Sequence, residues 1–137
     1  MSTPTELGLP RWHAIVESGD SAGLADLVAE DAVFHSPAVF KPQEGKPLVV
    51  AYLTAALKVL GEDFSYVDEW PRENDAILEF TSTLGDLQVF GIDRITWDDH
   101  GRITEFTVMI RPLKSLNALV ERMGEELTAL AEAAKPE

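Results

Sequence analysis

Asp93 is the best candidate in this sequence for a chemically active side chain, because it interrupts an apolar run. It lies in the stretch 90–111, where two strand-like runs flank the turn-forming residues 98–101. A carboxylate in the middle of a strand, in a sheet that buries one face, is paired, solvated or functional. Alternation along the strand places Asp93 on the same face as Ile95 and Trp97. The sequence therefore predicts a pocket acid or base whose pKa is raised by burial.

A structural role is the alternative for Asp93. The carboxylate would then be bonded to the backbone or to a guanidinium group, and the candidate partners are Arg94, Arg102 and Arg111. Replacement by Asn separates the two roles. Loss of activity with little loss of folding indicates the pocket role, and a large fall in melting temperature indicates the structural role.

His35 is a candidate partner for Asp93, because an imidazole titrates near neutral pH. Its neighbour Ser36 is a candidate polar contact, and successive strand residues point to opposite faces. If Ser36 faces a pocket, His35 does not, unless Pro37 brings a bulge or a bend. His13 is a further candidate base, and His100 is expected to be solvated in its turn.

No motif of the sequence indicates a metal or a cofactor. The histidines number 3 and no pair has ligand spacing, so no metal site is expected. The absence of cysteine excludes disulfides, Cys-ligated zinc and a thiol nucleophile. There is no Gly-rich phosphate loop and no Gly-x-Ser-x-Gly elbow.

Composition indicates one globular domain. The chain has 137 residues, of which 45% are hydrophobic, enough for a core at this length. Its 11 basic and 24 acidic residues give a net charge of −13, which disfavours nucleic acid and anionic membranes as partners. No apolar run approaches transmembrane length, and the N-terminal segment lacks the basic start and apolar core of a signal peptide. We therefore expect a cytoplasmic protein.

The first half of the chain is predicted to be mostly helical. A helix is expected at residues 10–19, because proline suits a first turn, and a short one at residues 24–28. A strand at residues 32–37 ends at a proline. A third helix at residues 47–60 has one apolar side and a glycine at its C-terminal cap.

The second half is predicted to be a sheet followed by a helix. Strands at residues 64–70, 76–84, 87–97 and 102–111 are joined by short turns, so consecutive strands should be antiparallel. In the last helix, at residues 113–134, apolar residues recur at steps of three and four. This stripe is expected to cover the protein's own core or a dimer partner, while the acidic side is solvated or docks another protein. We expect one domain over residues 1–137, with residues 113–135 as a C-terminal helical extension.

Several short motifs stand in a specific order within this pattern. They are Arg11-Trp12 before Gly19-Asp20, the run 24–37, Gly45 before the third helix, and Phe90-Gly-Ile-Asp93 leading into Trp97-Asp-Asp-His-Gly101. In this order they resemble the nuclear transport factor 2-like superfamily over about residues 10–112. That group includes ketosteroid isomerases, limonene epoxide hydrolase and SnoaL-like polyketide cyclases.

The resemblance implies an α+β fold. A cone-shaped, strongly curved antiparallel sheet is expected to wrap around the N-terminal helices, with a C-terminal helix beside it. Many members dimerise through the sheet, so a homodimer is expected. The fold supports many activities, so it does not by itself imply one.

The resemblance also suggests roles for three positions. Asp93 falls where ketosteroid isomerases carry an acid that stays protonated and donates a hydrogen bond to the substrate oxyanion. Ser36 stands where those enzymes carry their proton-shuttling Asp, and Trp12 stands where they carry an oxyanion-binding Tyr. Serine is no base at neutral pH without a partner, and an indole N–H donates but has no acid function.

The expected function is a pocket for a small apolar molecule that carries a carbonyl or hydroxyl group. The reaction would be proton transfer of the ketosteroid isomerase or polyketide cyclase type, as isomerisation, dehydration or cyclisation, without a cofactor. The predicted catalytic residues are Asp93 and His35. The predicted ligand-binding residues are Trp12, Ser36, Tyr52, Phe80, Trp97, Phe106, Val108 and Ile110. The alternative is a non-catalytic ligand-binding or protein-interaction module of the same fold, which the changed isomerase positions favour.

Overall fold

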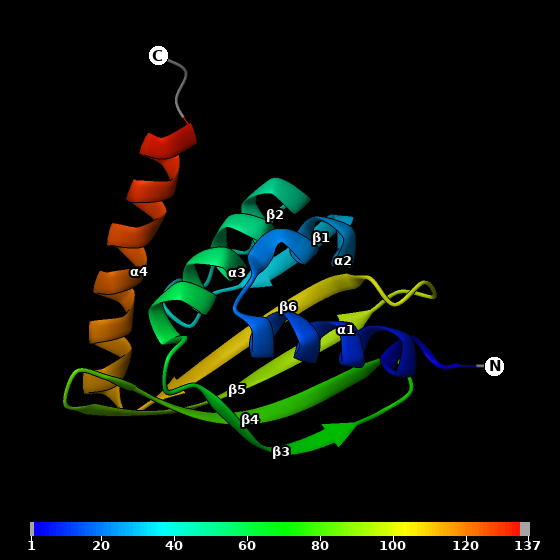
Figure 1. The fold of residues 1–137 in the computed structure, drawn as a ribbon, viewed down its shortest axis with the longest axis horizontal. Helices are drawn as coiled ribbons and strands as arrows, with labels where there is room; N and C mark the ends of the chain where they lie inside the picture. Colours follow the sequence, from blue (N-terminus) through cyan, green and yellow to red (C-terminus); the bar gives the residue numbers. More distant parts are fainter. Residues whose placement is uncertain (1, 135–137) are drawn as a thin grey trace.

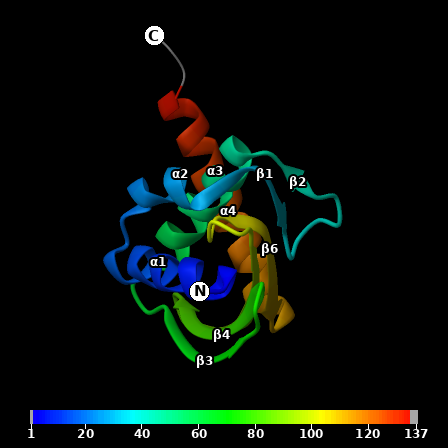
Figure 2. The ribbon, with the colours of Figure 1, turned by 90° about the vertical axis from the view of Figure 1, so that its right-hand side faces the viewer.

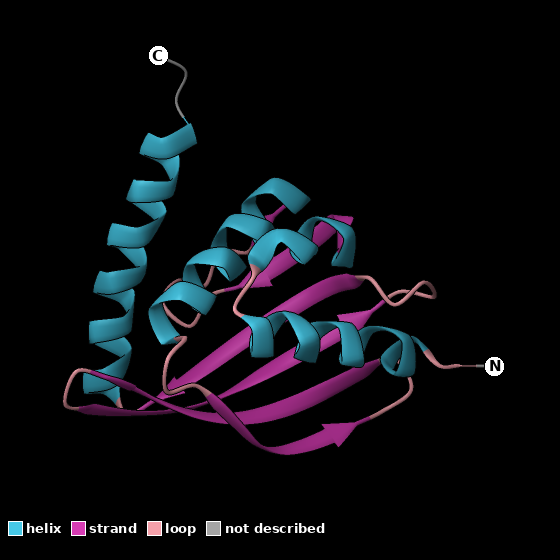
Figure 3. Cartoon of the chain, viewed as in Figure 1, coloured by secondary structure: helices cyan, strands magenta, loops and turns pink. Residues whose placement is uncertain are grey.

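The computed structural model describes residues 2–134, which form helices on one side of a six-stranded sheet (Figures 1 and 3). The elements are α1 (Pro4–Ser18), the short helix η1 (Ser21–Gly23), α2 (Leu24–Leu27), β1 (Val28–His35), β2 (Gln43–Glu44), α3 (Lys46–Leu60), β3 (Ser65–Pro71), β4 (Asp75–Leu84), β5 (Leu87–Trp97), β6 (Ile103–Arg111) and α4 (Leu113–Ala134). The strand order is β2-β1-β6-β5-β4-β3. The architecture is the predicted α+β fold with a C-terminal helix.

Strands β3 to β6 form the antiparallel meander that the sequence predicts, each pairing with the next along the chain. Strand β1 differs, because it pairs in parallel with β6 and antiparallel with β2. The sheet is therefore mixed and not purely antiparallel. Strand β1 also begins at Val28 and not at Ala32, and the short strand β2, which was not predicted, precedes α3. No local pattern encodes this parallel pairing, because it joins strands far apart in the sequence.

Helix α1 begins at Pro4, so the start predicted at Pro10 is wrong. Thr3 and Glu6 form a reciprocal capping box, in which each side chain accepts a hydrogen bond from the other residue's backbone N–H. This cap satisfies two of the free donors at the helix start. Pro10 then lies inside the helix, where its ring removes one backbone donor without ending the helix.

The sheet curls around α1 without closing, which gives the expected cone shape (Figure 2). Gly8 lets α1 lie close to β5, because a Cβ atom at this position would clash with the indole of Trp97. This close approach carries Trp12 onto the inner face of the sheet, where it is 3% exposed. Helices α3 and α4 pack against each other, and α4 also contacts β4, β5 and β6.

The core lies between the helices and the inner face of the sheet. Strand β4 alternates between the two faces, with Phe80, Ser82 and Leu84 all buried on the inner face. Phe80, Phe106, Leu53, Leu78 and Ile95 are among its largest fully buried side chains. Within residues 2–134, no helix is both long and apolar enough to span a membrane.

Candidate functional site

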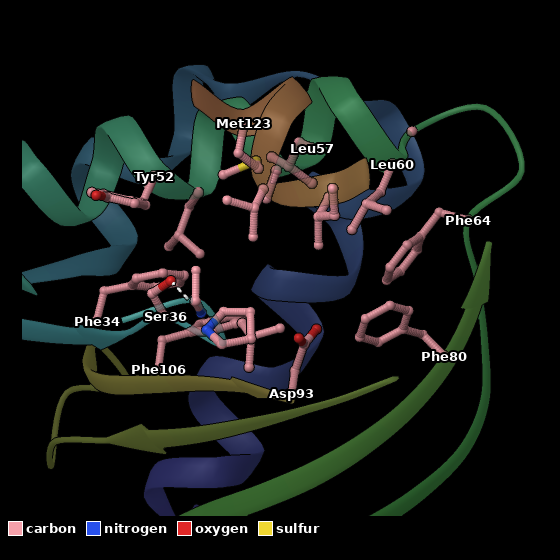
Figure 4. Close-up of a pocket in the computed structure, with 18 of the residues that line it drawn as sticks. Phe34, Ser36, Tyr52, Leu57, Leu60, Phe64, Phe80, Asp93, Phe106 and Met123 are labelled. Carbon is pink, nitrogen blue, oxygen red and sulfur yellow. Dashed lines mark hydrogen bonds between the residues drawn. The ribbon is translucent and has the colours of Figure 1, made fainter. Parts of the chain in front are cut away.

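A cavity of about 280 Å³ lies between the inner face of the sheet and the helices α1, α3 and α4 (Figure 4). Its walls are mostly leucine, valine and aromatic side chains, which come from every one of these elements. Asp93 on β5 is the sole carboxylate among the lining residues within the described range. Pockets of this kind, apolar with a few polar groups, are the usual sites of small ligands.

Asp93 lies at the centre of the sheet, with Leu78 of β4 and Val108 of β6 directly opposite it on the two neighbouring strands. Its residue is only 5% exposed. The Oη–H of Tyr66 donates to its Oδ2 over 2.5 Å. Within residues 2–134 no donor reaches the other oxygen, Oδ1, and the carboxylate points into the cavity (Figure 4). One oxygen is therefore held by the protein and the other is left for a ligand.

Tyr66 is itself held in place by Trp12. The indole Nε1–H of Trp12 donates to the Tyr66 Oη over 2.9 Å. The chain of bonds thus runs from α1 through β3 to β5, and each donor hydrogen in it is used. Because the phenol gives its only hydrogen to Asp93, it can serve a ligand only as a weak further acceptor.

Burial controls the electrostatics of Asp93. Desolvation raises the pKa of this carboxyl from 3.8 to about 7, and the hydrogen bond from Tyr66 opposes the rise. The pKa of Tyr66 is also raised well above its ordinary value, first by burial and then by the charge of Asp93. At neutral pH the phenol therefore stays protonated, while Asp93 exchanges its proton readily. A group that titrates near the working pH is suited to general acid–base chemistry.

The arginines considered as partners of Asp93 are used elsewhere. Arg94 forms an ion pair with Asp75, and Arg102 forms one with Asp98. The guanidinium of Arg111 lies over the ring of Phe90, 5.9 Å from its centroid. Within the described part of the chain, Asp93 thus has a neutral donor as its partner and no cation.

Six of the predicted ligand-binding residues line the cavity with Asp93. They are Trp12, Ser36, Tyr52, Phe80, Phe106 and Val108. The Oγ of Ser36 accepts the backbone N–H of Ala38 over 3.0 Å, which leaves its hydroxyl hydrogen available to donate. Tyr52 stacks on Phe34 with ring centroids 5.1 Å apart.

The structure does not bring His35, Trp97 and Ile110 to this cavity. His35 points to the other face of the strand, where its Nε2 lies 2.7 Å from the Oε1 of Glu105. Trp97 is the C-terminal residue of β5 and is buried against Gly8. Ile110 packs into a second apolar cluster with Leu119. Strand alternation explains why the side chain of His35 points away from the cavity, since its neighbour Ser36 is the residue that faces inward.

The other histidines are also outside the cavity. The Nε2 of His13 contacts the side-chain carboxyl group of Glu69 on β3, and His100 is exposed in its turn. Within residues 2–134 no cluster of three or more His, Asp or Glu side chains could hold a metal ion.

Sequence reasoning missed two parts of this site. The first part is Tyr66, which was not predicted as the partner of Asp93. It reaches past β4 from β3, and a register shift beside Tyr66 interrupts the regular alternation of that strand. The second part is the wall built by α4, which consists of Leu119, Val120, Met123, Gly124 and Leu127. The apolar stripe of this helix was the available signal, but it did not say which surface the helix covers.

Comparison with known proteins gives a consistent family. The family model described as a SnoaL-like domain matches residues 9–106. The crystal structure of a steroid delta-isomerase from Pseudomonas aeruginosa matches with 40% identity and a TM-score of 0.86, covering 90% of this chain and 91% of that chain. An uncharacterised bacterial protein with a cystatin-like fold from Silicibacter pomeroyi matches with 32% identity and a TM-score of 0.83, covering 90% of this chain and 87% of that chain.

A more distant match concerns the fold alone. An NTF2-like protein of unknown function from Mesorhizobium loti is 19% identical with a TM-score of 0.69, covering 80% of this chain and 91% of that chain. A search of curated proteins found no match.

Proposed function

Because this chain belongs to the SnoaL-like domain family of the NTF2-like superfamily, we propose that it is an isomerase-type enzyme acting on a neutral, apolar carbonyl compound. The observation that carries the proposal is the free Oδ1 of Asp93, on a carboxyl whose pKa is about 7, at the base of an apolar cavity. The 40% identity to a protein named steroid delta-isomerase supports the same reaction class.

Proton transfer by Asp93 is the proposed chemistry. The ionised carboxylate takes a proton from the carbon between a carbonyl group and a carbon–carbon double bond. The electrons of that C–H bond form a dienolate, and the negative charge rests on the ligand oxygen. The protonated Asp93 then returns the proton to the far carbon of the original double bond, so that the product is a conjugated ketone and the carboxylate is restored.

Ser36 is proposed to bind the oxygen of the ligand. Its hydroxyl hydrogen is free to donate, because its Oγ accepts from the backbone of Ala38. A donor directed at the oxygen that gains charge stabilises the dienolate. Tyr66 acts through Asp93, since its hydroxyl donates to the Oδ2 of that carboxyl, and Trp12 acts one step further back by donating to the Oη of Tyr66.

The test follows the conversion of a β,γ-unsaturated ketosteroid into its conjugated isomer by the absorbance of the conjugated ketone. We expect Asp93→Asn to lower turnover by about 100-fold or more, as for loss of a general acid–base group. The matched control is Asp86→Asn, which removes an acid in the exposed turn between β4 and β5. Turnover by the wild type that persists in Asp93→Asn would overturn the proposed mechanism.

A binding module without catalysis is the second candidate. The observation in its favour is that the described lining of the cavity contains Ser36 but no carboxyl besides Asp93. A ketone that binds the wild type, loses affinity in Asp93→Asn and is never converted would support this candidate.

We also propose that the chain forms a homodimer through the outer face of its sheet. The helices lie on the inner face, so the outer face has no covering layer (Figure 1). It carries the exposed apolar side chains of Trp70 and Met109, which are 52% and 59% exposed. Exposed apolar patches of this kind often mark interfaces. Sedimentation analysis should give a dimer that Trp70→Glu weakens, and a wild-type monomer at all concentrations would reject it.

A further inference from the structure

Gly124 has no evident reason to be glycine in its own helix. It lies inside α4, where glycine is a poor helix former. Its backbone shows no positive φ, unlike Gly19, Gly45, Gly85 and Gly101. A Cβ atom added at Gly124 would meet nothing within 4 Å, so close packing does not require glycine either. What the residue provides is open space.

That open space borders the cavity. Gly124 lines it together with Val120 and Leu127, which follow the same edge of the helix at steps of four and three residues. This edge is partly in contact with solvent, since Val120 is 41% exposed. Another lining residue, Val39 in the loop after β1, is 49% exposed. The cavity therefore has a closed end at Asp93 and an open, apolar edge at α4.

Resting on the proposed function, we propose that Gly124 keeps open a passage through which the apolar body of an elongated ligand leaves the cavity. The oxygen-bearing end of the ligand stays at Asp93. The cavity volume of about 280 Å³ lies just below the roughly 300–1,000 Å³ typical of ligand pockets, so a longer molecule must extend beyond it.

The chemistry of the cavity selects a neutral ligand of this shape. The lining is apolar apart from a few groups, and the single carboxylate among the described lining residues disfavours an anion. The net charge of −13 acts in the same direction. The ligand class is a neutral amphiphile with one oxygen function and a long apolar chain or fused-ring body.

Helix α4 is the element that sets the permitted length. The family match ends at residue 106, whereas α4 begins at Leu113. The α4 wall is therefore outside the part of the chain that the family model describes. A side chain larger than hydrogen at position 124 should fill the passage without disturbing the site around Asp93.

The experiment measures calorimetric affinity for methyl n-alkyl ketones of increasing chain length, from pentyl to undecyl. In the wild type, affinity should rise by about fourfold for each added methylene that is buried, and the rise should continue to the longest chains. Gly124→Leu should leave the shortest ketone within about twofold and weaken the longest by about tenfold or more, because several methylenes lose their contact surface.

Asn117→Leu is the matched control, because it adds the same side chain at an exposed α4 position that does not line the cavity. It should keep the wild-type length dependence, and circular dichroism confirms that both variants are folded. If the ketones bind the wild type through Asp93 and their affinity depends on chain length equally in Gly124→Leu, the proposed passage is wrong and the proposed function still stands. Absence of binding by every ketone overturns both.

Discussion

Asp75 and Asp93 lie on the neighbouring antiparallel strands β4 and β5, and both are buried, with 7% and 5% of their surface exposed. Their pKa values nevertheless move in opposite directions from 3.8, to about 2 for Asp75 and to about 7 for Asp93. The difference lies in the partners and in the depth of burial, since desolvation is the main influence on the pKa of Asp93 and the bond from Arg72 is the main influence on that of Asp75. Arg72 donates to both oxygens of Asp75 over 2.7 and 2.6 Å, and Arg94 adds a third bond. Asp93 receives one neutral phenol.

Burial alone therefore does not mark a functional carboxylate. Asp75 is a structural residue, because its backbone carbonyl also accepts from Thr5 and Arg72, which joins α1 to the start of β4. Among the described residues Asp93 has neither a cation nor such a joint, and one neutral hydrogen bond from Tyr66 offsets only part of the cost of its burial. A folded protein keeps such a group only at a cost in stability, which is why perturbed carboxyls are candidates for function.

The largest test of this comparison is Asp93→Asn. A carboxyl whose folded pKa lies above its unfolded pKa favours folding fully below pH 3.8, and this contribution is lost as the pH rises through about 7. The shift of about three units corresponds to roughly 4 kcal/mol as an upper bound. Asp93→Asn should therefore raise the free energy of unfolding at about pH 8, by roughly 2–4 kcal/mol, and change it little near pH 4.

Denaturant unfolding of both proteins at the two pH values measures this effect. The relevant quantity is the difference between variant and wild type, since other groups titrate equally in both proteins. A difference that is independent of pH, or a variant that is less stable at the higher pH, would contradict the assignment of Asp93 as a buried carboxyl that is only partly compensated.

Asp75→Asn should act in the opposite direction. The folded pKa of Asp75 is lowered, so its contribution to stability is present above pH 3.8 and is lost as the pH falls through about 2. Because both arginines are largely exposed, solvent weakens the pairs. We expect a loss of about 1–2 kcal/mol at neutral pH, which shrinks below about pH 4. Urea unfolding over this range measures it, and a loss that persists undiminished in acid would contradict the assignment of this stability to the charged pairs.

Tyr66→Phe addresses the one hydrogen bond that opposes the rise in the pKa of Asp93. Its removal should move the titration midpoint of Asp93 upward, measured by carbon NMR of the labelled carboxyl. It should also cost about 1 kcal/mol, because Trp12 loses its acceptor. Tyr52→Phe is the matched control, since that hydroxyl makes no hydrogen bond to Asp93. If the titration midpoint of Asp93 moves downward or stays unchanged in Tyr66→Phe, the hydrogen bond from Tyr66 does not control the pKa of Asp93.

Much of the fold follows from local sequence patterns, and the misses have a common cause. Alternation places Asp93 on the buried face of β5, and the turns around Gly85 and Gly101 produce the predicted hairpins. The contact between Tyr66 and Asp93 joins strands that are not neighbours in the sheet, so no pairing rule reveals it. The parallel pairing of β1 with β6 is non-local in the same way.

Arg94 offers the smallest and most specific test, because it is the direct neighbour of Asp93 in the sequence. On a strand the two side chains point to opposite faces, and the Nη2 of Arg94 donates to Asp75 over 3.1 Å. Its side chain is 52% exposed, so Arg94→Ala should cost only about 0.5 kcal/mol at neutral pH. Arg72→Ala should cost more, since it removes two shorter bonds from the same carboxylate.

Neither change should move the titration midpoint of Asp93, because the sheet separates that carboxyl from both guanidinium groups. An upward shift in Arg94→Ala, seen by the same NMR titration, would mean that its charge reaches Asp93 and that the two aspartates are not independent.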